Sequence, residues 1–146
     1  MKMFHWLVPL LLFIFSLPCY AHHMAVVVGK HSGVTSLTSA QLGKIFRAEI
    51  KKWPDGREIV LIMHRSSPGE SLTLRRLNKM SALQWEQWKL DYRESLTLVD
   101  SDKDLLDVVV SIPGAIGLID VRSVDGRVTV VRVDGRLPLE AGYLPH

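Results

Sequence analysis

The chain has 146 residues, and its 18 Lys and Arg against 15 Asp and Glu give a formal net charge of +3. Its basic residues are scattered, so nucleic acid is not an expected partner, because nucleic acids are bound by a basic patch or stripe. The length suits a single domain, and the one cysteine excludes a disulfide framework.

The amino-terminal segment is typical of a signal peptide. Lys2 precedes an apolar run over residues 6–17 that is too short to span a membrane, and Ala21 is a small residue at the expected cleavage point. We therefore expect export to the periplasm, with residues 1–21 removed. The remainder is expected to form one domain over residues 22–136, followed by an extended or poorly ordered tail over residues 137–146.

Two short apolar runs predict buried strands. Residues 25–29 are rich in valine and end in glycine, and residues 59–63 are apolar at every position. Strands covered on both faces are apolar at every position, whereas strands with one exposed face alternate apolar and polar residues. The pattern predicts a sheet with helices on both sides, in which residues 59–63 form a central strand.

Three helix starts are marked by capping pairs, in which a Ser or Thr precedes a polar or acidic residue by three positions. The pairs are Thr38 with Gln41, Ser81 with Gln84, and Ser101 with Asp104. In the second helix, Trp85, Trp88 and Tyr92 recur at helical spacing, which favours packing in the core over a ligand platform.

The last third of the domain contains turn and strand signals. Pro113 and Gly114 end the third helix. Residues 115–121 and 127–133, on either side of a turn at residues 125–126, are expected to form a pair of strands or a strand with a return segment. Helices therefore alternate with strands through the chain. This alternation predicts an α/β domain.

Three local patterns resemble the phosphate-binding proteins of ABC importers, which belong to the two-lobed periplasmic solute-binding proteins. They are the Leu-Thr, helix, Ile-Phe and Trp pattern of residues 36–53, the strand and Arg-Ser-Ser-Pro-Gly-Glu-Ser loop of residues 59–71, and Pro-Gly-Ala-Ile-Gly at residues 113–117. Their order and spacing agree with the family over most of residues 25–121. The resemblance implies the fold of a single lobe, mainly the second lobe of the family.

The resemblance also implies a site for phosphate or sulfate at the loop that follows the second strand. Its residues would be Arg65, Ser66, Ser67, Gly69 and Ser71. A strand that leads through such a loop into a helix presents free backbone N–H groups and the positive end of the helix dipole to an anion. Arg65 would add a charge-assisted hydrogen bond.

Two features depart from the family. The chain lacks the length to form the opposing lobe, so an anion could not be enclosed by closure of two lobes. In addition, Glu70 stands where the family loop has small neutral residues. Ser67, Pro68 and Glu70 equally match an ordinary helix start, with Ser67 as N-cap and Glu70 completing a capping box. An anion site and a plain helix cap therefore both remain open.

The sequence contains no nucleophile elbow, zinc-binding helix pair or mononucleotide loop, so neither an enzyme nor a cofactor or metal is expected. We expect a periplasmic binding protein for a small oxyanion, with a membrane receptor or transporter as a further partner. The alternative is a protein-interaction or sensory module in which the anion site is vestigial.

Overall fold

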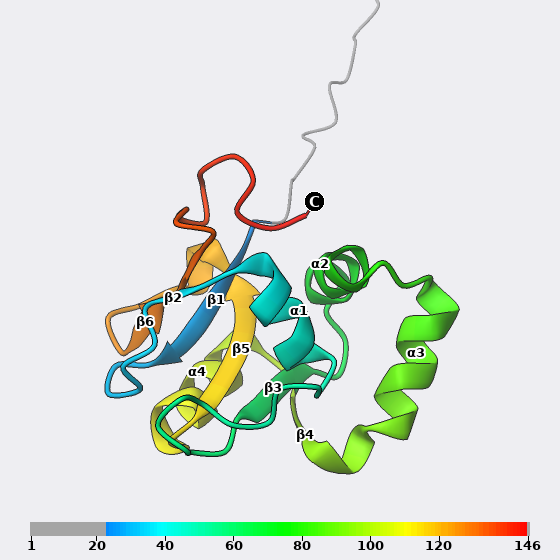
Figure 1. The fold of residues 1–146 in the computed structure, drawn as a ribbon, viewed down its shortest axis with the longest axis horizontal. Helices are drawn as coiled ribbons and strands as arrows, with labels where there is room; N and C mark the ends of the chain where they lie inside the picture. Colours follow the sequence, from blue (N-terminus) through cyan, green and yellow to red (C-terminus); the bar gives the residue numbers. More distant parts are fainter. Residues whose placement is uncertain (1–22, 146) are drawn as a thin grey trace, which may run out of the picture.

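A computed structural model describes residues 23–145, so the expected signal peptide lies outside the described residues. Figure 1 shows one mixed sheet between two layers of helices. The sheet strands are β1 (Met24–Gly29), β3 (Val60–His64), β4 (Leu96–Val99), β5 (Ala115–Asp120) and β6 (Val128–Val130). The helices are α1 (Ser39–Phe46), α2 (Pro68–Asn78), α3 (Ala82–Asp91) and α4 (Asp102–Ser111).

The strand order in the sheet is β4-β3-β5-β1-β6. β3 runs parallel to both β4 and β5, whereas β1 is antiparallel to β5 and β6. Two further short strands, β2 (Ser36–Leu37) and β7 (Arg132–Val133), form a separate parallel pair. The chain is therefore an α/β domain, as the alternation of elements predicted.

The interior strand β3 illustrates why its sequence is apolar throughout. Leu61 and Met63 pack with residues of α1, α2 and α3 on one face of the sheet, whereas Ile62 packs with α4 on the other. Both faces of the strand are therefore removed from water. Polar residues at alternate positions would be buried without hydrogen-bond partners. The predicted central strand is confirmed, displaced by one residue.

The three predicted helix starts are confirmed. Thr38 and Ser81 each form a complete, reciprocal capping box at the start of α1 and α3. Ser101 caps α4 by accepting a hydrogen bond from the backbone N–H of Asp104 at 3.1 Å. Each cap satisfies an N–H group that the first helical turn leaves without a partner.

The aromatic residues of α3 pack as the sequence predicted. Trp85 and Trp88 are buried and stacked, with ring centroids 5.1 Å apart and an interplanar angle of 5°. Tyr92 stacks on Trp88 at 4.9 Å. Trp85 and Trp88 join the core cluster on the α1 side of the sheet and attach α3, which lies at the periphery of the domain in Figure 1. Tyr92, the C-cap of α3, is exposed and belongs to the stack but not to the core.

The Pro-Gly-Ala-Ile-Gly segment has a structural explanation at its first glycine. Gly114 has a φ of +85°, and a Cβ at this position would lie 2.2 Å from the carbonyl oxygen of Glu58. The carbonyl of Gly114 accepts hydrogen bonds from the indole of Trp53 and the backbone of Val60, both at 3.0 Å. Only glycine tolerates this φ and this close approach. The segment thereby holds the start of β5 against the loop before β3.

The described part of the carboxyl-terminal tail, residues 137–145, differs from the extended or poorly ordered end that we expected. Tyr143 and Leu144 are buried in the core. The hydroxyl of Tyr143 donates a hydrogen bond to the carbonyl of Val131 and accepts one from the N–H of Val26 at 3.2 Å. The sequence lacked a signal for this contact, because the bonded groups are backbone atoms remote in the chain.

Candidate functional site

The predicted loop lies at the carboxyl edge of the parallel strands. β3 ends at His64 and leads through Arg65 and Ser66 to Ser67, the N-cap of α2, with Pro68 at the first helical position. β4 ends at the same edge and leads into α4, so Asp100 comes close to the loop. Ligands of open α/β sheets bind beyond this edge.

Arg65 is accessible but already has an acidic partner. Its side chain is 56% exposed, and Nη1 donates a hydrogen bond to Oδ1 of Asp100 at 2.8 Å. The two residues are brought together by the pairing of β3 with β4. The expected counter-charge for an anion is present, and the Asp100 carboxylate competes for it.

The other predicted loop residues differ in what they offer a ligand. Within residues 23–145 the N–H groups of Ser66 and Ser67 donate no hydrogen bond. Ser66 is exposed, but the hydroxyl of Ser67 accepts from the N–H of Glu70 at 3.3 Å, and Gly69 is buried. The N–H of Ser71 bonds to the carbonyl of Ser67. The exposed polar groups are thus concentrated at Arg65, Ser66 and Ser67.

Glu70 does not complete the expected capping box. Its carboxylate turns away from the N-cap and is 2% exposed. Oε2 accepts a hydrogen bond from the backbone N–H of His64 at 2.9 Å, and Oε1 lies 3.2 Å from His64 Nδ1. The N-cap and proline of the predicted helix start are confirmed, but the role of Glu70 was predicted wrongly. The side chain also does not occupy the loop amides.

His64 is the centre of a buried charge cluster that the sequence did not reveal. Its ring is 4% exposed, and Nε2 lies 2.8 Å from Oδ1 of Asp102 at the start of α4. The second oxygen of Asp102 accepts hydrogen bonds from the hydroxyl of Ser123 at 2.6 Å and the N–H of Asp120 at 3.3 Å. The cluster therefore connects the ends of β3 and β5 with the starts of α2 and α4.

The two carboxylates favour a protonated imidazole. Burial opposes the charge, but the hydrogen bonds to Asp102 and Glu70 outweigh it and raise the pKa of His64 to about 9. Burial raises the pKa of Glu70, against its bonds to His64. The pKa of Asp102 is lowered despite burial, because His64 and Ser123 donate to it. Both ring nitrogens are engaged in a buried site, so the imidazole is poorly placed to exchange protons with a solute.

Other binding chemistries have little support in the described part of the chain. No group of three or more His, Cys, Asp and Glu side chains within residues 23–145 is arranged to hold a metal ion. None of the helices in the same residues combines the length and apolarity needed to cross a membrane.

Comparison with known proteins shows the fold. No protein-family model and no curated protein matches the sequence. Among solved structures, an ABC-type phosphate transport receptor from Vibrio cholerae matches with a TM-score of 0.66 and 22% identity, over 80% of this chain and 48% of that chain. PstS from Borrelia burgdorferi matches with a TM-score of 0.64 and 19% identity, over 80% and 49%.

A third match is a phosphate ABC transporter substrate-binding protein from Clostridium perfringens, whose structure contains bound phosphate. It has a TM-score of 0.63 and 24% identity, over 80% of this chain and 46% of that chain. The present chain thus spans about half the length of the solved structures that it matches. By its fold, the chain corresponds to one lobe of the phosphate ABC transporter substrate-binding proteins.

Proposed function

We propose that the protein binds a small oxyanion, phosphate or sulfate, at the loop formed by Arg65, Ser66, Ser67, Gly69 and Ser71, and that it acts as a binding protein rather than an enzyme. The observation that carries the proposal is an exposed Arg65 beside the unpaired N–H groups of Ser66 and Ser67, at the start of the 11-residue helix α2. These groups and the helix dipole favour an anion. Glu70 leaves the loop open because its carboxylate bonds to His64.

Binding is expected to be weak in the isolated protein. The loop lies on the surface, where water competes for each hydrogen bond, and an anion must displace the Asp100 carboxylate from Arg65. Phosphate is bound in the similar structure from Clostridium perfringens, of which the present chain covers 46%. A membrane receptor or transporter that covers the loop would supply further donors and exclude water.

The test is titration calorimetry with phosphate and sulfate at constant ionic strength. Arg65→Ala should weaken binding about 10- to 100-fold, the range for loss of a charged hydrogen bond. Asp100→Asn should strengthen binding several-fold, because it frees the guanidinium without changing its position. Arg76→Ala is the control, since it removes an exposed arginine at the far end of α2.

Glu70 is unsuitable for this test, although its position in the sequence suggests it. Replacing Glu70 with Ser removes a partner of buried His64, so the fold would change along with the loop. Equal binding by wild type, Arg65→Ala and Arg76→Ala would contradict the proposal. So would the absence of binding in Asp100→Asn.

The second candidate function is a protein-interaction or sensory module with a vestigial anion site. The observation in its favour is that Arg65 already has Asp100 as a partner at 2.8 Å. An internal pair of this kind supplies the charge balance that a ligand would otherwise provide. Failure of both anions to bind wild type and Asp100→Asn would favour this function.

A periplasmic location belongs to the same proposal and depends on residues 1–21, which the structure does not describe. The measurement is the intact mass of protein recovered from the periplasmic fraction. We expect a species that begins at His22, because cleavage follows Ala21. A membrane-bound species that retains Met1 would contradict this expectation.

A further inference from the structure

Helix α3 has apolar residues on two opposite faces. Its inner face carries the stacked Trp85 and Trp88, which are buried against the core. Its outer face carries Leu83 and Leu90, whose exposed fractions are 81% and 60%. Exposed apolar side chains mark an interaction surface where they adjoin further apolar surface, and Leu83 adjoins Met80 and Trp88.

The spacing on the outer face suits helix packing. Leu83 and Leu90 are seven residues apart and therefore lie on one side of the helix, with Gln87 between them. A groove of about 690 Å³ borders this stripe between the end of α2 and α3. Met80, Leu83 and Trp88 give its lining apolar surface, and the other lining residues are polar or charged: Asn78, Lys79, Gln84, Gln87 and Asp91. The surface thus offers an apolar ridge beside a shallow groove of mixed character, and helices pack by fitting ridges into grooves.

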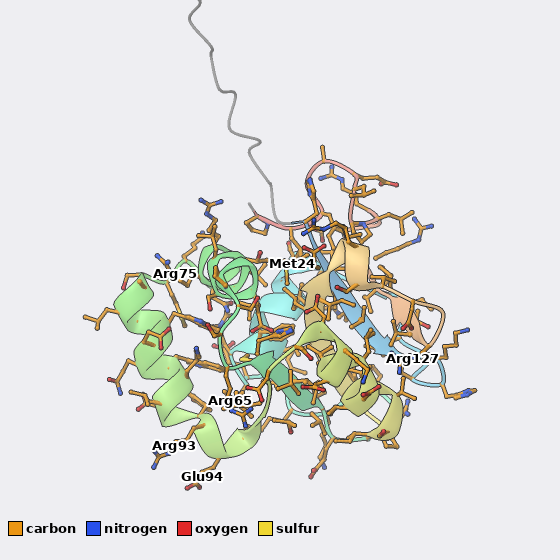
Figure 2. The ribbon with its side chains drawn as sticks, turned by 180° about the vertical axis from the view of Figure 1, so that it is seen from behind. Met24, Arg65, Arg75, Arg93, Glu94 and Arg127 are labelled. Atoms are coloured by element: carbon orange, nitrogen blue, oxygen red, sulfur yellow. The ribbon has the colours of Figure 1, made fainter. Side chains whose placement is uncertain are left out.

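The ends of α3 differ in charge. Arg76 and Lys79 lie at the α2 end, whereas Asp91 and Glu94 lie at the other end, where Arg93 offsets one of these two charges. Figure 2 shows Arg75 near the first end and Arg93 with Glu94 at the second. Lys79 and Glu94 are exposed, and neither forms an ion pair within residues 23–145. The charges are therefore available to a partner of opposite polarity.

We propose that the outer face of α3 binds a second copy of this chain, with the two α3 helices antiparallel about a two-fold axis. An axis between Glu86 and Gln87 places Leu83 opposite Leu90 of the second copy. Lys79, the C-cap of α2, and Glu94, in the 3-10 turn after α3, lie beyond the two ends of α3. The antiparallel arrangement brings the Lys79 end of one copy to the Glu94 end of the other, twice by symmetry. Both the apolar and the charged positions are thus self-complementary, as a two-fold interface requires. A single short helix from each copy makes a small contact, so the dimer forms in a concentration-dependent way.

The apolar part of the proposal is tested by analytical ultracentrifugation of the purified protein over micromolar to millimolar concentrations. The average molar mass of the wild type should rise with concentration towards twice the monomer mass. Leu83→Glu should raise the dissociation constant at least about tenfold, since it places a charge in the apolar contact. The control is Leu139→Glu, because Leu139 is 72% exposed but lies in the carboxyl-terminal segment. A wild type that stays monomeric throughout, or a Leu83→Glu protein that dimerises normally, overturns the proposal.

The charged part is tested by reversal. Lys79→Glu and Glu94→Lys should each weaken the dimer, because each sets like charges opposite one another. The double variant should return the dissociation constant to within about threefold of the wild-type value. If the double variant is no tighter than the two single variants, the antiparallel arrangement is wrong. These variants leave the loop at Arg65 unchanged, so their result is independent of anion binding.

Discussion

Replacing His64 with leucine should lower the free energy of unfolding by about 3–5 kcal/mol, the cost of breaking a buried ion pair by removing one partner. The Glu70 carboxylate is 2% exposed, and its charged partner within hydrogen-bonding distance is the His64 ring. Without the ring, Glu70 must remain as an uncompensated buried charge or take up a proton. Asp102 is less affected, because Ser123 and the backbone of Asp120 still donate to it.

The measurement is urea unfolding at pH 7, with a double variant as the matched control. In His64→Leu/Glu70→Gln, the amide oxygen of residue 70 can still accept the backbone hydrogen bond of residue 64, and no charge is buried. This variant should recover most of the loss, since replacing both partners is far less costly than removing one. A single variant as stable as the wild type, or a double variant no better than the single one, would contradict the ion pair.

The second large effect is a loss of stability in alkaline solution. The pKa of His64 rises from an ordinary value of 6.5 to about 9 in the folded state. The folded state therefore binds this proton more tightly than the unfolded state does. The resulting stabilisation is complete below pH 6.5 and is lost as the pH rises through 9. The shift corresponds to about 3 kcal/mol.

The carboxyl groups of Glu70 and Asp102 change the pH dependence of stability in opposite directions. Burial raises the pKa of Glu70, so this group also loses stabilisation as the pH rises above its unfolded value. The lowered pKa of Asp102 has the opposite effect, because its contribution is present near neutrality and lost in acid. The cluster should therefore be most stable in mildly acidic to neutral solution, with an alkaline decline dominated by His64.

Urea unfolding at pH 6 and pH 10 measures this effect, and His64→Gln/Glu70→Gln is the comparison, because neither glutamine titrates and no carboxyl group is left at position 70 without its partner. The difference in stability between the two pH values should be smaller in the variant by about 3 kcal/mol. Buried Tyr143, whose pKa burial raises to about 12, contributes equally to both proteins and cancels. If both proteins lose the same stability between these pH values, His64 is not protonated at neutral pH.

The buried cluster around His64 also explains how the loop before α2 can be exposed to solvent and still have a defined conformation. Glu70 binds the last residue of β3 through both backbone and ring, six positions before its own place in the chain. The loop is held from beneath by these bonds, while Arg65 and Ser66 remain at the surface. The Glu70 carboxylate is thus paired with His64 inside the domain. The backbone N–H groups of Ser66 and Ser67 remain able to bind a ligand.

Features that depend on near neighbours in the chain were predictable from the amino-acid sequence. The helix starts at Thr38, Ser81 and Ser101 were predictable, because each cap joins groups three residues apart. The buried strands were predictable from unbroken apolarity. The short edge strand β4 was missed because Leu96–Val99 gives too few positions for a pattern.

The partners of the charged groups depend on contacts between elements that are far apart in the chain. Glu70 had two possible partners, and the local capping box gave way to the imidazole of His64 once the fold buried both. His64 meets Asp102 across 38 positions, and Arg65 meets Asp100 across 35. A sequence shows which groups carry charge and which cap a nearby turn. It does not show which remote charge will lie beside it, because strand pairing and helix packing determine that, and burial without a partner is costly.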